Sequence, residues 1–309
     1  MLKSWIDFKI IVMHKLIIGI LGLTLLVACK KDETVEPDPP KLKFSVEFDE
    51  TLPRLGNFGE PVTVAPGNAA QSPDMNGVSL HYIELAPSGL TPLTEGAIVY
   101  AGEETLLGGA KAVDFDKAGT FAHGETVLTV DLSTLPPGTY RWIRASLTYQ
   151  NFDIDYRYNN PPYADNVDLT GTLASFVGYN TFISSHKVKD STVLVNDDML
   201  QGYWAFETGG TISGYTFGDV FEGEGAGVTV VNPISDTSPI PPGSCVVTGE
   251  LETPLVITGN ETEDVEIVLA ISTNLSFEWE EIVEDGKFEP GVGEAVVDMG
   301  LRGLHPRKK

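Results

Sequence analysis

The sequence predicts an all-β protein built as a β-sandwich, on three observations. Residues 42–48 alternate between apolar side chains at even positions and polar or charged ones at odd positions, which is typical of a strand with one buried face. The chain holds 32 glycines and 20 prolines, and these form turn-like clusters between its other apolar runs. No stretch after residue 41 shows the 3.6-residue period of an amphipathic helix. Many short strands without helices favour a sandwich.

Further strands are predicted along the chain. The longest alternation, residues 266–280, places Ile267, Leu269 and Trp279 on one face and predicts a single long strand. Residues 209–243 are rich in Gly, Thr, Ser and Pro, and we interpret them as a long loop or a sub-domain break. Apart from this possible break, we expect residues 42–309 to form a single domain with long loops. The other predicted strands are residues 78–85, 97–100, 127–132, 140–149, 172–183, 193–195, 255–258 and 295–299.

One motif refines the predicted fold. Residues 135–140 read Leu-Pro-Pro-Gly-Thr-Tyr and lead into the strand predicted from Tyr140. They resemble the tyrosine corner of Greek-key β-sandwiches of the immunoglobulin or prealbumin kind. The resemblance implies a Greek-key sandwich in which the Tyr140 hydroxyl bonds to backbone a few residues upstream.

The N-terminal region predicts export and a lipid anchor. The apolar run 16–27 follows Lys15, which suits a signal peptide and is too short to span a membrane. It leads into Leu-Val-Ala-Cys at residues 26–29, which resembles the lipobox of bacterial lipoproteins. The resemblance implies a signal peptide over residues 1–28 and acylation of Cys29, which would attach the protein to a membrane.

The residues after Cys29 indicate which way the protein faces. The sequence Lys-Lys-Asp-Glu at residues 30–33 resembles the surface-export signal of Bacteroidota lipoproteins. It implies an outer-membrane lipoprotein exposed at the cell surface, with retention in the periplasm as the alternative. Residues 29–41 are charged and proline-rich, and they predict a flexible tether.

Charge and cysteine content restrict the classes of partner. The chain has 44 acidic and 20 basic residues, a formal net charge of −24. This balance argues against nucleic acid, because phosphate binding needs clusters of Lys and Arg. With Cys29 acylated, the only other cysteine is Cys245, so we expect no intramolecular disulfide and a buried Cys245.

An aromatic and acidic segment is the first candidate binding site. Residues 149–163 contain five aromatic residues, two aspartates and three asparagines. Sugars stack their C–H faces on aromatic rings and pair their hydroxyls with such polar groups, and aromatic residues also mark protein interfaces. The alternative is a strand whose even-numbered side chains cover the core. The candidate ligand-binding residues are Tyr149, Phe152, Asp153, Asp155, Tyr156, Tyr158 and Tyr163.

Residues 281–294 resemble a calcium-binding loop. Asp285-Gly286 would match positions five and six of an EF-hand loop, and Glu281 position one. Val283 and Val292 occupy positions that need oxygen ligands. The alternative is a hairpin turn at Asp285-Gly286. Apart from metal ions, the sequence indicates no cofactor, and the candidate calcium ligands are Glu281, Asp285, Glu289 and Glu294.

Two further resemblances concern modification and copper. Asp-Ser-Thr at residues 190–192 resembles an O-glycosylation acceptor of Bacteroidota and implies a glycan on Ser191. Residues 42–44, 137–140 and 202–207 are similar to the MbnP-like family and imply copper binding. The histidines of the chain do not, however, follow a metal-ligand spacing.

Signatures of catalysis are missing from the sequence, which has no Gly-x-Ser-x-Gly, His-Glu-x-x-His, phosphate-binding or dinucleotide motif. The sequence therefore predicts a lipid-anchored, non-catalytic binding protein. Extracellular glycan is the first ligand, because surface lipoproteins of the group that this chain resembles often hold polysaccharide. The alternatives are an adhesin or envelope-assembly protein with a protein partner, a secreted hydrolase, and a metal-binding lipoprotein.

Overall fold

A computed structural model describes residues 38–56, 60–225, 246–299 and 301–309. The predicted signal peptide (1–28), residues 29–37 of the predicted tether, which include Cys29, and Cys245 lie outside the described residues. So does the second half of the segment 209–243. In the part of the chain that the structure describes, no helix is long and apolar enough to cross a membrane.

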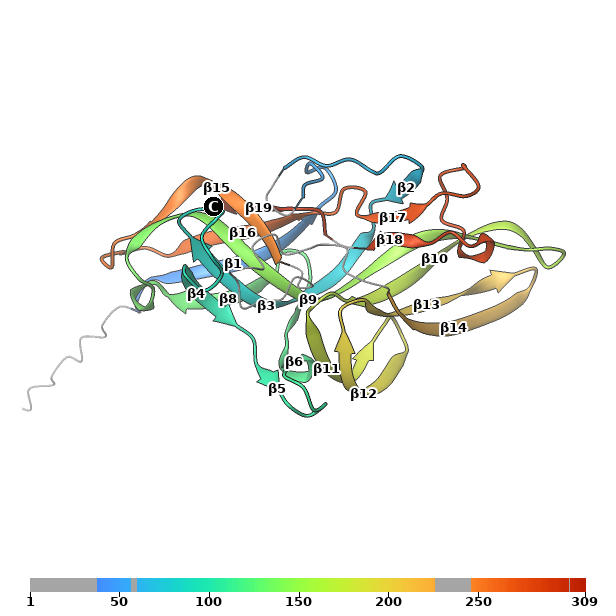
Figure 1. Cartoon of the computed structure of the whole chain (residues 1–309), viewed down its shortest axis with the longest axis horizontal. Helices are drawn as coiled ribbons and strands as arrows, with labels where there is room; N and C mark the ends of the chain where they lie inside the picture. The colour runs from blue at the N-terminus through green and yellow to red at the C-terminus, as the bar shows by residue number, and fades with distance from the viewer. Residues whose placement is uncertain (1–37, 57–59, 226–245, 300) are drawn as a thin grey trace, which may run out of the picture. The chain divides into compact units, whose positions relative to one another are not determined.

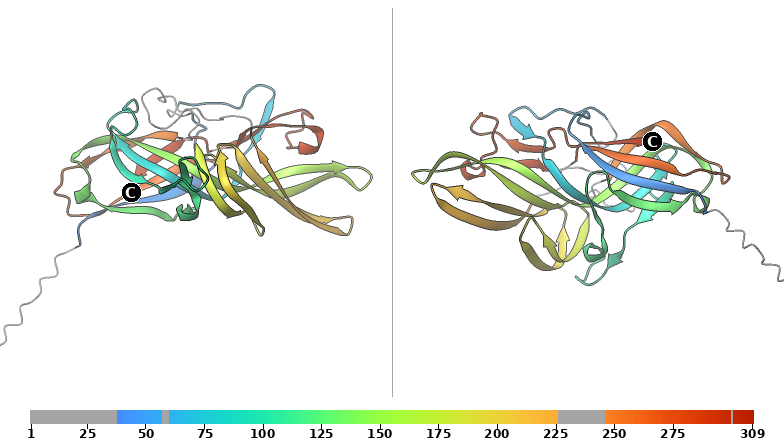
Figure 2. Two further views of the ribbon diagram at one scale, coloured as in Figure 1. Left: turned by 60° about the horizontal axis from the view of Figure 1, so that its bottom comes forward. Right: turned by 180° about the vertical axis from the view of Figure 1, so that it is seen from behind.

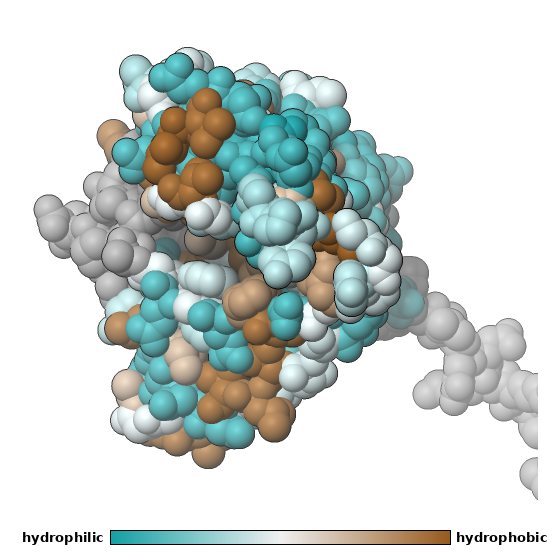
Figure 3. Space-filling view, turned by 90° about the vertical axis from the view of Figure 1, so that its right-hand side faces the viewer, coloured by the Kyte–Doolittle hydropathy of each residue, from teal (hydrophilic) through white to brown (hydrophobic). Residues whose placement is uncertain are grey.

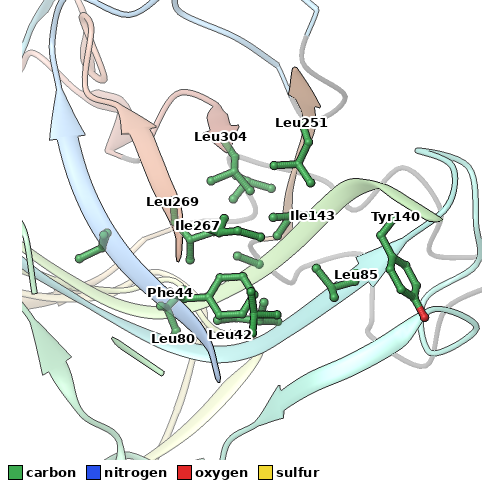
Figure 4. Packing of buried hydrophobic residues seen from close by; sticks show 14 of the residues in the cluster. Leu42, Phe44, Leu80, Leu85, Tyr140, Ile143, Leu251, Ile267, Leu269 and Leu304 are labelled. Atoms are coloured by element: carbon green, nitrogen blue, oxygen red, sulfur yellow. The ribbon is translucent and has the colours of Figure 1, made fainter. Parts of the chain in front are cut away.

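Two β-sheets face each other around one apolar core, as the sequence predicts. In the first sheet the strands run in the order β19, β16, β1, β8, and in the second β15 and β4 flank the pair β9–β3. Leu42 and Phe44 of β1 are fully buried and point at Leu80, Leu85 and Ile143 of the second sheet (Figure 4). The bounds are Lys41–Asp49 (β1), Thr126–Asp131 (β8), Val265–Ser272 (β16) and Leu304–Lys308 (β19) in the first sheet, and Asp74–Ala86 (β3), Ala97–Ala101 (β4), Gly138–Asn160 (β9) and Val246–Ile257 (β15) in the second.

The connections follow the Greek-key pattern. Strands β1, β3, β8 and β9 lie alternately in the first and the second sheet, and β15 then returns to pair with β9. At the start of β9, the Tyr140 hydroxyl donates a hydrogen bond to the carbonyl oxygen of Pro136 at 2.8 Å. This bond confirms the contact expected of a tyrosine corner.

Strand β9 is 23 residues long and continues past the sandwich. Its residues 138–146 pair with β15, and residues 149–160 pair along the same edge with β10 (Ala164–Phe176). Beyond β10 lie β13 (Tyr203–Ile212) and β14 (Tyr215–Glu224). Figures 1 and 2 show this extension, in green to gold, running away from the end that holds β15.

Two smaller sheets cover the two faces of the extension. Strands β11 and β12 bury Tyr149 and Phe176 on one face, and β17 and β18 bury Phe152 and Leu173 on the other. The first cover consists of β5 (Glu104–Thr105), β6 (Ala112–Asp114), β11 (Asn180–Lys187) and β12 (Thr192–Leu200), and the second of β2 (Asn68–Gln71), β17 (Phe277–Glu280) and β18 (Val296–Met299). The remaining described elements are β7 (Thr120–Phe121) and three 3₁₀ turns, Phe115–Lys117, Leu132–Thr134 and Pro290–Val292.

Three sequence predictions about strands are wrong in detail. Residues 266–280 form two strands in different sheets, β16 and β17, because the chain turns at Leu275, whose φ is 48°. Residues 172–183 are likewise divided between β10 and β11. Residues 209–224, interpreted as the start of a loop or a sub-domain break, belong to the β13–β14 hairpin.

Candidate functional site

A groove of about 1250 Å³ lies where the sheet extends beyond the sandwich. Its floor is the face of β9, β10, β13 and β14, and its roof is β18 with the connection between β17 and β18. Figure 3 looks onto this end of the molecule, where apolar surface lies on both sides of a hollow. Ligand sites in proteins are concave and largely apolar with a few polar groups, and this groove has that character.

Strand register brings the floor side chains onto one face. Because side chains alternate along a strand, residues that pair across strands share a face. Phe206 of β13 pairs with Leu173 of β10 on one side and with Phe221 of β14 on the other. The same face carries other aromatic side chains from three of these strands, which line the groove: Tyr156, Tyr158, Trp204, Tyr215 and Phe217.

Glycines beneath two of these rings set their orientation. A methyl group at Gly223 would come within 2.5 Å of the Trp204 ring, and one at Gly171 would overlap the Phe206 ring. Each ring therefore lies over the backbone of the neighbouring strand, in the space that a side chain would fill. Such pairing of an aromatic ring with a cross-strand glycine is a recognised way to fill a sheet surface. It makes the floor an aromatic platform, in which the Phe206 ring meets the Tyr156 ring edge-on at an interplanar angle of 79°.

A polar row crosses the middle of this floor. The hydroxyls of Tyr156 and Thr208 are hydrogen-bonded at 2.6 Å, and Thr208 pairs across the strands with Asp219. Burial raises the pKa of Tyr156, so its hydroxyl stays neutral at physiological pH. Phe206 and Phe221 lie on one side of the row, and Phe217 and Tyr215 on the other. The floor therefore alternates aromatic, polar and aromatic bands.

Large aromatic side chains are exposed at the mouth of the groove. Tyr163 is 74% exposed, Tyr215 81% and Phe221 51%. Several exposed aromatic side chains around one groove mark ligand or partner sites more often than single exposed residues do. The mouth is therefore the part of the groove that a long ligand would reach first.

The structure brings three of the predicted ligand-binding residues into the groove, namely Tyr156, Tyr158 and Tyr163. Tyr149 instead packs on the opposite face against Phe176, and its hydroxyl donates to the carbonyl oxygen of Lys187 at 3.2 Å. Phe152 is buried under β17. Tyr149 and Phe152 therefore cover the core, which is the alternative that the sequence left open.

The two aspartates of the same segment do not line the groove. Asp153 accepts hydrogen bonds from Thr172 and Asn76 at 2.5 and 3.2 Å. Asp155 accepts one from Thr170 at 2.8 Å. Odd-numbered positions of β9 face away from the groove floor, so these carboxylates stabilise cross-strand contacts on the other side of the sheet.

Sequence reasoning missed the groove residues of β13 and β14. Trp204 and Phe206 belong to the segment 202–207 of the family resemblance, and the alternation of Tyr215, Phe217 and Phe221 lies in the segment that the sequence predicts as a loop or a sub-domain break. The signal was present, because aromatic residues at alternate positions are typical of a strand. The surrounding glycines obscured it.

The roof is held in place by two glutamates of the predicted calcium loop. Both carboxylate oxygens of Glu294 accept backbone N–H groups, from Ile282 at 3.0 Å and from Glu289 at 2.6 Å. Glu281 accepts N–H groups of Asp285 and Gly286, each at 2.8 Å. These carboxylates therefore fix the fold of the loop through charge-assisted hydrogen bonds.

The other two predicted calcium ligands lie beside an arginine. Asp285 pairs with Arg157 at 2.5 Å, and Glu289 lies 3.8 Å from the same guanidinium group. Burial, together with the neighbouring Asp285, raises the pKa of Glu289. Among the residues that the structure describes, no three His, Cys, Asp or Glu side chains gather as a metal ion would require.

Ser191, the predicted glycosylation site, lies between β11 and β12. It is half-buried, and its backbone N–H donates to Glu207 at 3.0 Å. The serine is at the opposite side of the sheet from the groove, since Glu207 alternates with the floor residues Phe206 and Thr208.

Comparisons of the chain with family models, with curated proteins and with solved structures give no match.

Proposed function

We propose that this protein is a lipid-anchored, surface-exposed and non-catalytic binding protein that holds an extracellular glycan in the aromatic groove. The observation that carries the proposal is the floor, in which flat aromatic rings flank the polar row of Tyr156, Thr208 and Asp219. A sugar ring has the same division, because it presents apolar C–H faces and a rim of hydroxyls.

The dimensions of the groove favour a chain of sugars over a single one. Sites for drug-sized molecules occupy about 300–1000 Å³, and this groove is larger at about 1250 Å³. Its mouth is also lined with exposed rings, including Tyr163 and Tyr215. Further sugar units could stack on these rings outside the floor.

The carboxylates of the groove favour binding over hydrolysis. Glycosidases need two carboxyl groups on opposite sides of the scissile bond. Of the carboxylates that line the groove, Glu294 is engaged by backbone N–H groups and Glu222 accepts the Tyr203 hydroxyl at 3.1 Å. That leaves Asp219, which alone does not form a catalytic pair.

A protein partner is the second candidate, and the edge of the sheet favours it. β14 is ten residues long, and no strand in the described part of the chain pairs with its outer edge. An unpaired edge can accept an extended segment of another protein. Val220 and Phe221 are exposed along it.

A binding panel tests the glycan proposal. We would use the full chain carrying Cys29→Ser, which cannot be acylated, and measure its melting temperature with a set of purified polysaccharides. A ligand at about 100 times its Kd should stabilise the fold by about 2.7 kcal/mol. We expect Trp204→Ala and Tyr215→Ala to remove the effect, and Tyr179→Ala, which changes an exposed tyrosine outside the groove, to retain it. If every polysaccharide leaves the melting temperature unchanged, the protein-partner proposal takes its place.

The anchor is tested separately in cells. Cys29→Ser should move the protein from the membrane fraction to the soluble fraction and abolish incorporation of labelled fatty acid. Added protease should digest the wild-type protein on intact cells if it faces the medium. Protection of the wild-type protein from that protease would instead indicate retention in the periplasm.

A further inference from the structure

The described side chains that line the groove include negative ones and no positive ones. Its lining includes Asp219, Glu222 and Glu294, whereas none of the described residues that line it is a lysine, an arginine or a histidine. The whole chain carries a formal charge of −24. A ligand with carboxylate or sulfate groups would therefore enter a negative field without a counter-charge.

The two basic residues next in sequence to groove-lining residues, Arg157 and Lys287, are already paired with acids. Arg157 lies between the groove residues Tyr156 and Tyr158 in β9, but it pairs with Asp168 at 2.8 Å and with Asp285 at 2.5 Å. Lys287 of the roof connection lies 3.5 Å from Asp168. Alternation along β9 directs Arg157 away from the floor, so these cations do not balance the charge inside the groove.

Of the three groove carboxylates, Asp219 is the one that faces the ligand. Glu294 and Glu222 accept hydrogen bonds from groups of the protein itself. Asp219 is exposed in the middle of the floor, opposite Thr208. A carboxylate in this position can accept two hydroxyl hydrogens of a sugar through charge-assisted bonds, and it repels an anionic group.

We infer that the groove selects uncharged glycans over glycans that carry carboxylate or sulfate groups, and that Asp219 is the residue that sets this preference. The inference rests on the proposed function for the nature of the ligand. The charge preference itself is a property of the groove and can be measured with any aromatic probe that binds there.

The test compares dyes of different charge on the full chain carrying Cys29→Ser. Thioflavin T is cationic, Nile red is neutral and anilinonaphthalene sulfonate is anionic, and each fluoresces on binding to an aromatic surface. We expect the cationic and neutral dyes to bind at least tenfold more tightly than the anionic one. Trp204→Ala should weaken all three, which places them in the groove. The preference should shrink in 0.5 M NaCl, because salt screens exposed charges.

Substitutions on β14 assign the preference to Asp219. Asp219→Lys should lower the ratio of cationic to anionic dye affinity at least tenfold, and Asp219→Asn should lower it by less. The matched control is Glu224→Lys, which makes the same change of charge on the same strand. Glu224 pairs with Tyr203, whose side chain packs on the opposite face, so this variant should keep the wild-type ratio. Circular dichroism verifies that each variant is folded, and Asp219→Asn remains informative if Asp219→Lys is not.

The outcomes separate this inference from the proposed function. Equal affinity for the three dyes, an unchanged ratio in both Asp219 variants, or no dye binding that depends on Trp204 would overturn the inference. So would a polysaccharide panel in which only polyanionic chains such as hyaluronate bind, although that result would support a glycan-binding function. The expected dye order without binding of any polysaccharide would overturn the proposed function and leave the charge preference standing.

Discussion

At the scale of single residues, Tyr140 shows how one hydroxyl can hold a connection between two sheets. Its ring is buried in the sandwich core, and its hydroxyl reaches the carbonyl oxygen of Pro136. Gly138 lies directly beside the ring, and a methyl group added there would come within 3.1 Å of a ring carbon, closer than an ordinary van der Waals contact. The residues Pro-Pro-Gly-Thr-Tyr thus form one packing unit.

We expect Tyr140→Phe to lower the free energy of unfolding by about 1–2 kcal/mol, because the carbonyl oxygen of Pro136 would lose its donor in this part-buried hydrogen bond. Urea denaturation of the two proteins measures the difference. Tyr215→Phe is the control, since that side chain is almost fully exposed, and it should leave stability unchanged. An unaltered midpoint in Tyr140→Phe would show that the corner does not need its hydrogen bond.

His186 is the second residue from which a measurement follows. It is buried between the rings of Phe176 and Tyr203, and neither ring nitrogen has a hydrogen-bond partner among the described residues. Burial lowers the pKa of His186 to about 4, from about 6.5 in the unfolded chain. Between these values the unfolded state binds more protons than the folded state, so stability falls as the pH falls.

His186→Leu should reduce this acid sensitivity. The wild-type protein is expected to lose about 3 kcal/mol through this group between pH 6.5 and pH 4, because its pKa is about 4 in the folded state and about 6.5 in the unfolded chain. The variant should lose less over the same interval and should be at least as stable at pH 7.5, because a buried unpaired polar group is removed. Denaturant titrations at half-unit steps of pH provide the comparison. Parallel curves for the two proteins would mean that His186 binds its proton as readily in the folded state as in the unfolded chain.

At the scale of elements, the β13–β14 hairpin shows what glycine does in this sheet. Gly171 and Gly223 weaken the local strand propensity, but they leave space for the rings of Phe206 and Trp204. Gly218, on the same strand as Gly223, has open space where a side chain would be. Two glycines of one strand therefore differ in whether they position a groove side chain.

Gly223→Ala should weaken ligand binding by about tenfold, the effect of about 1.4 kcal/mol, because the added methyl group displaces the Trp204 ring from the floor. Gly218→Ala should bind like the wild type. Tryptophan fluorescence reports the displacement, and dye or glycan titration reports affinity. Equal affinities in the two variants would show that the orientation of Trp204 does not matter for binding.

The same elements show how far the sequence could predict the fold. The alternation at residues 42–48 and the Pro-Gly-Thr-Tyr turn are local patterns, and they predicted β1 and the corner correctly. The sequence could not reveal the break between β16 and β17 at Leu275. Apolar residues fall on odd-numbered positions both before the turn, as at Ile271, and at Leu275, so the alternation continues through the break. The groove depends on pairing between β10, β13 and β14. The register between strands so far apart in the sequence cannot be predicted from a local sequence pattern.

At the scale of the whole molecule, the site is built where one sheet serves two structures. The first half of β9 belongs to the sandwich, and the second half carries the groove floor. The two halves are parts of one continuous strand, with no flexible linker between them. The position of the groove floor is therefore fixed by the packing of the sandwich core. Buried pairs such as Arg54 and Glu278 connect β17 of the cover to the chain that precedes β2. The aromatic platform is thus preorganised, which lowers the entropy cost of ligand binding.

The excess of acids leads to a last prediction, for the stability of the whole protein. With a formal charge of −24 and an isoelectric point of about 4.4, repulsion among carboxylates outweighs attraction in ion pairs such as Lys309–Glu266 at neutral pH. Raising NaCl from 10 to 150 mM shortens the Debye length from about 30 Å to about 8 Å. We expect this change in salt to raise the free energy of unfolding by about 1 kcal/mol at pH 7.5, which corresponds to a rise in Tm of about 2–4 °C for a domain of this size. At pH 4.4 the net repulsion disappears, and the same addition of salt should leave Tm constant or lower it. If Tm instead falls with salt at pH 7.5, attraction within ion pairs outweighs repulsion among the excess acids in the folded state.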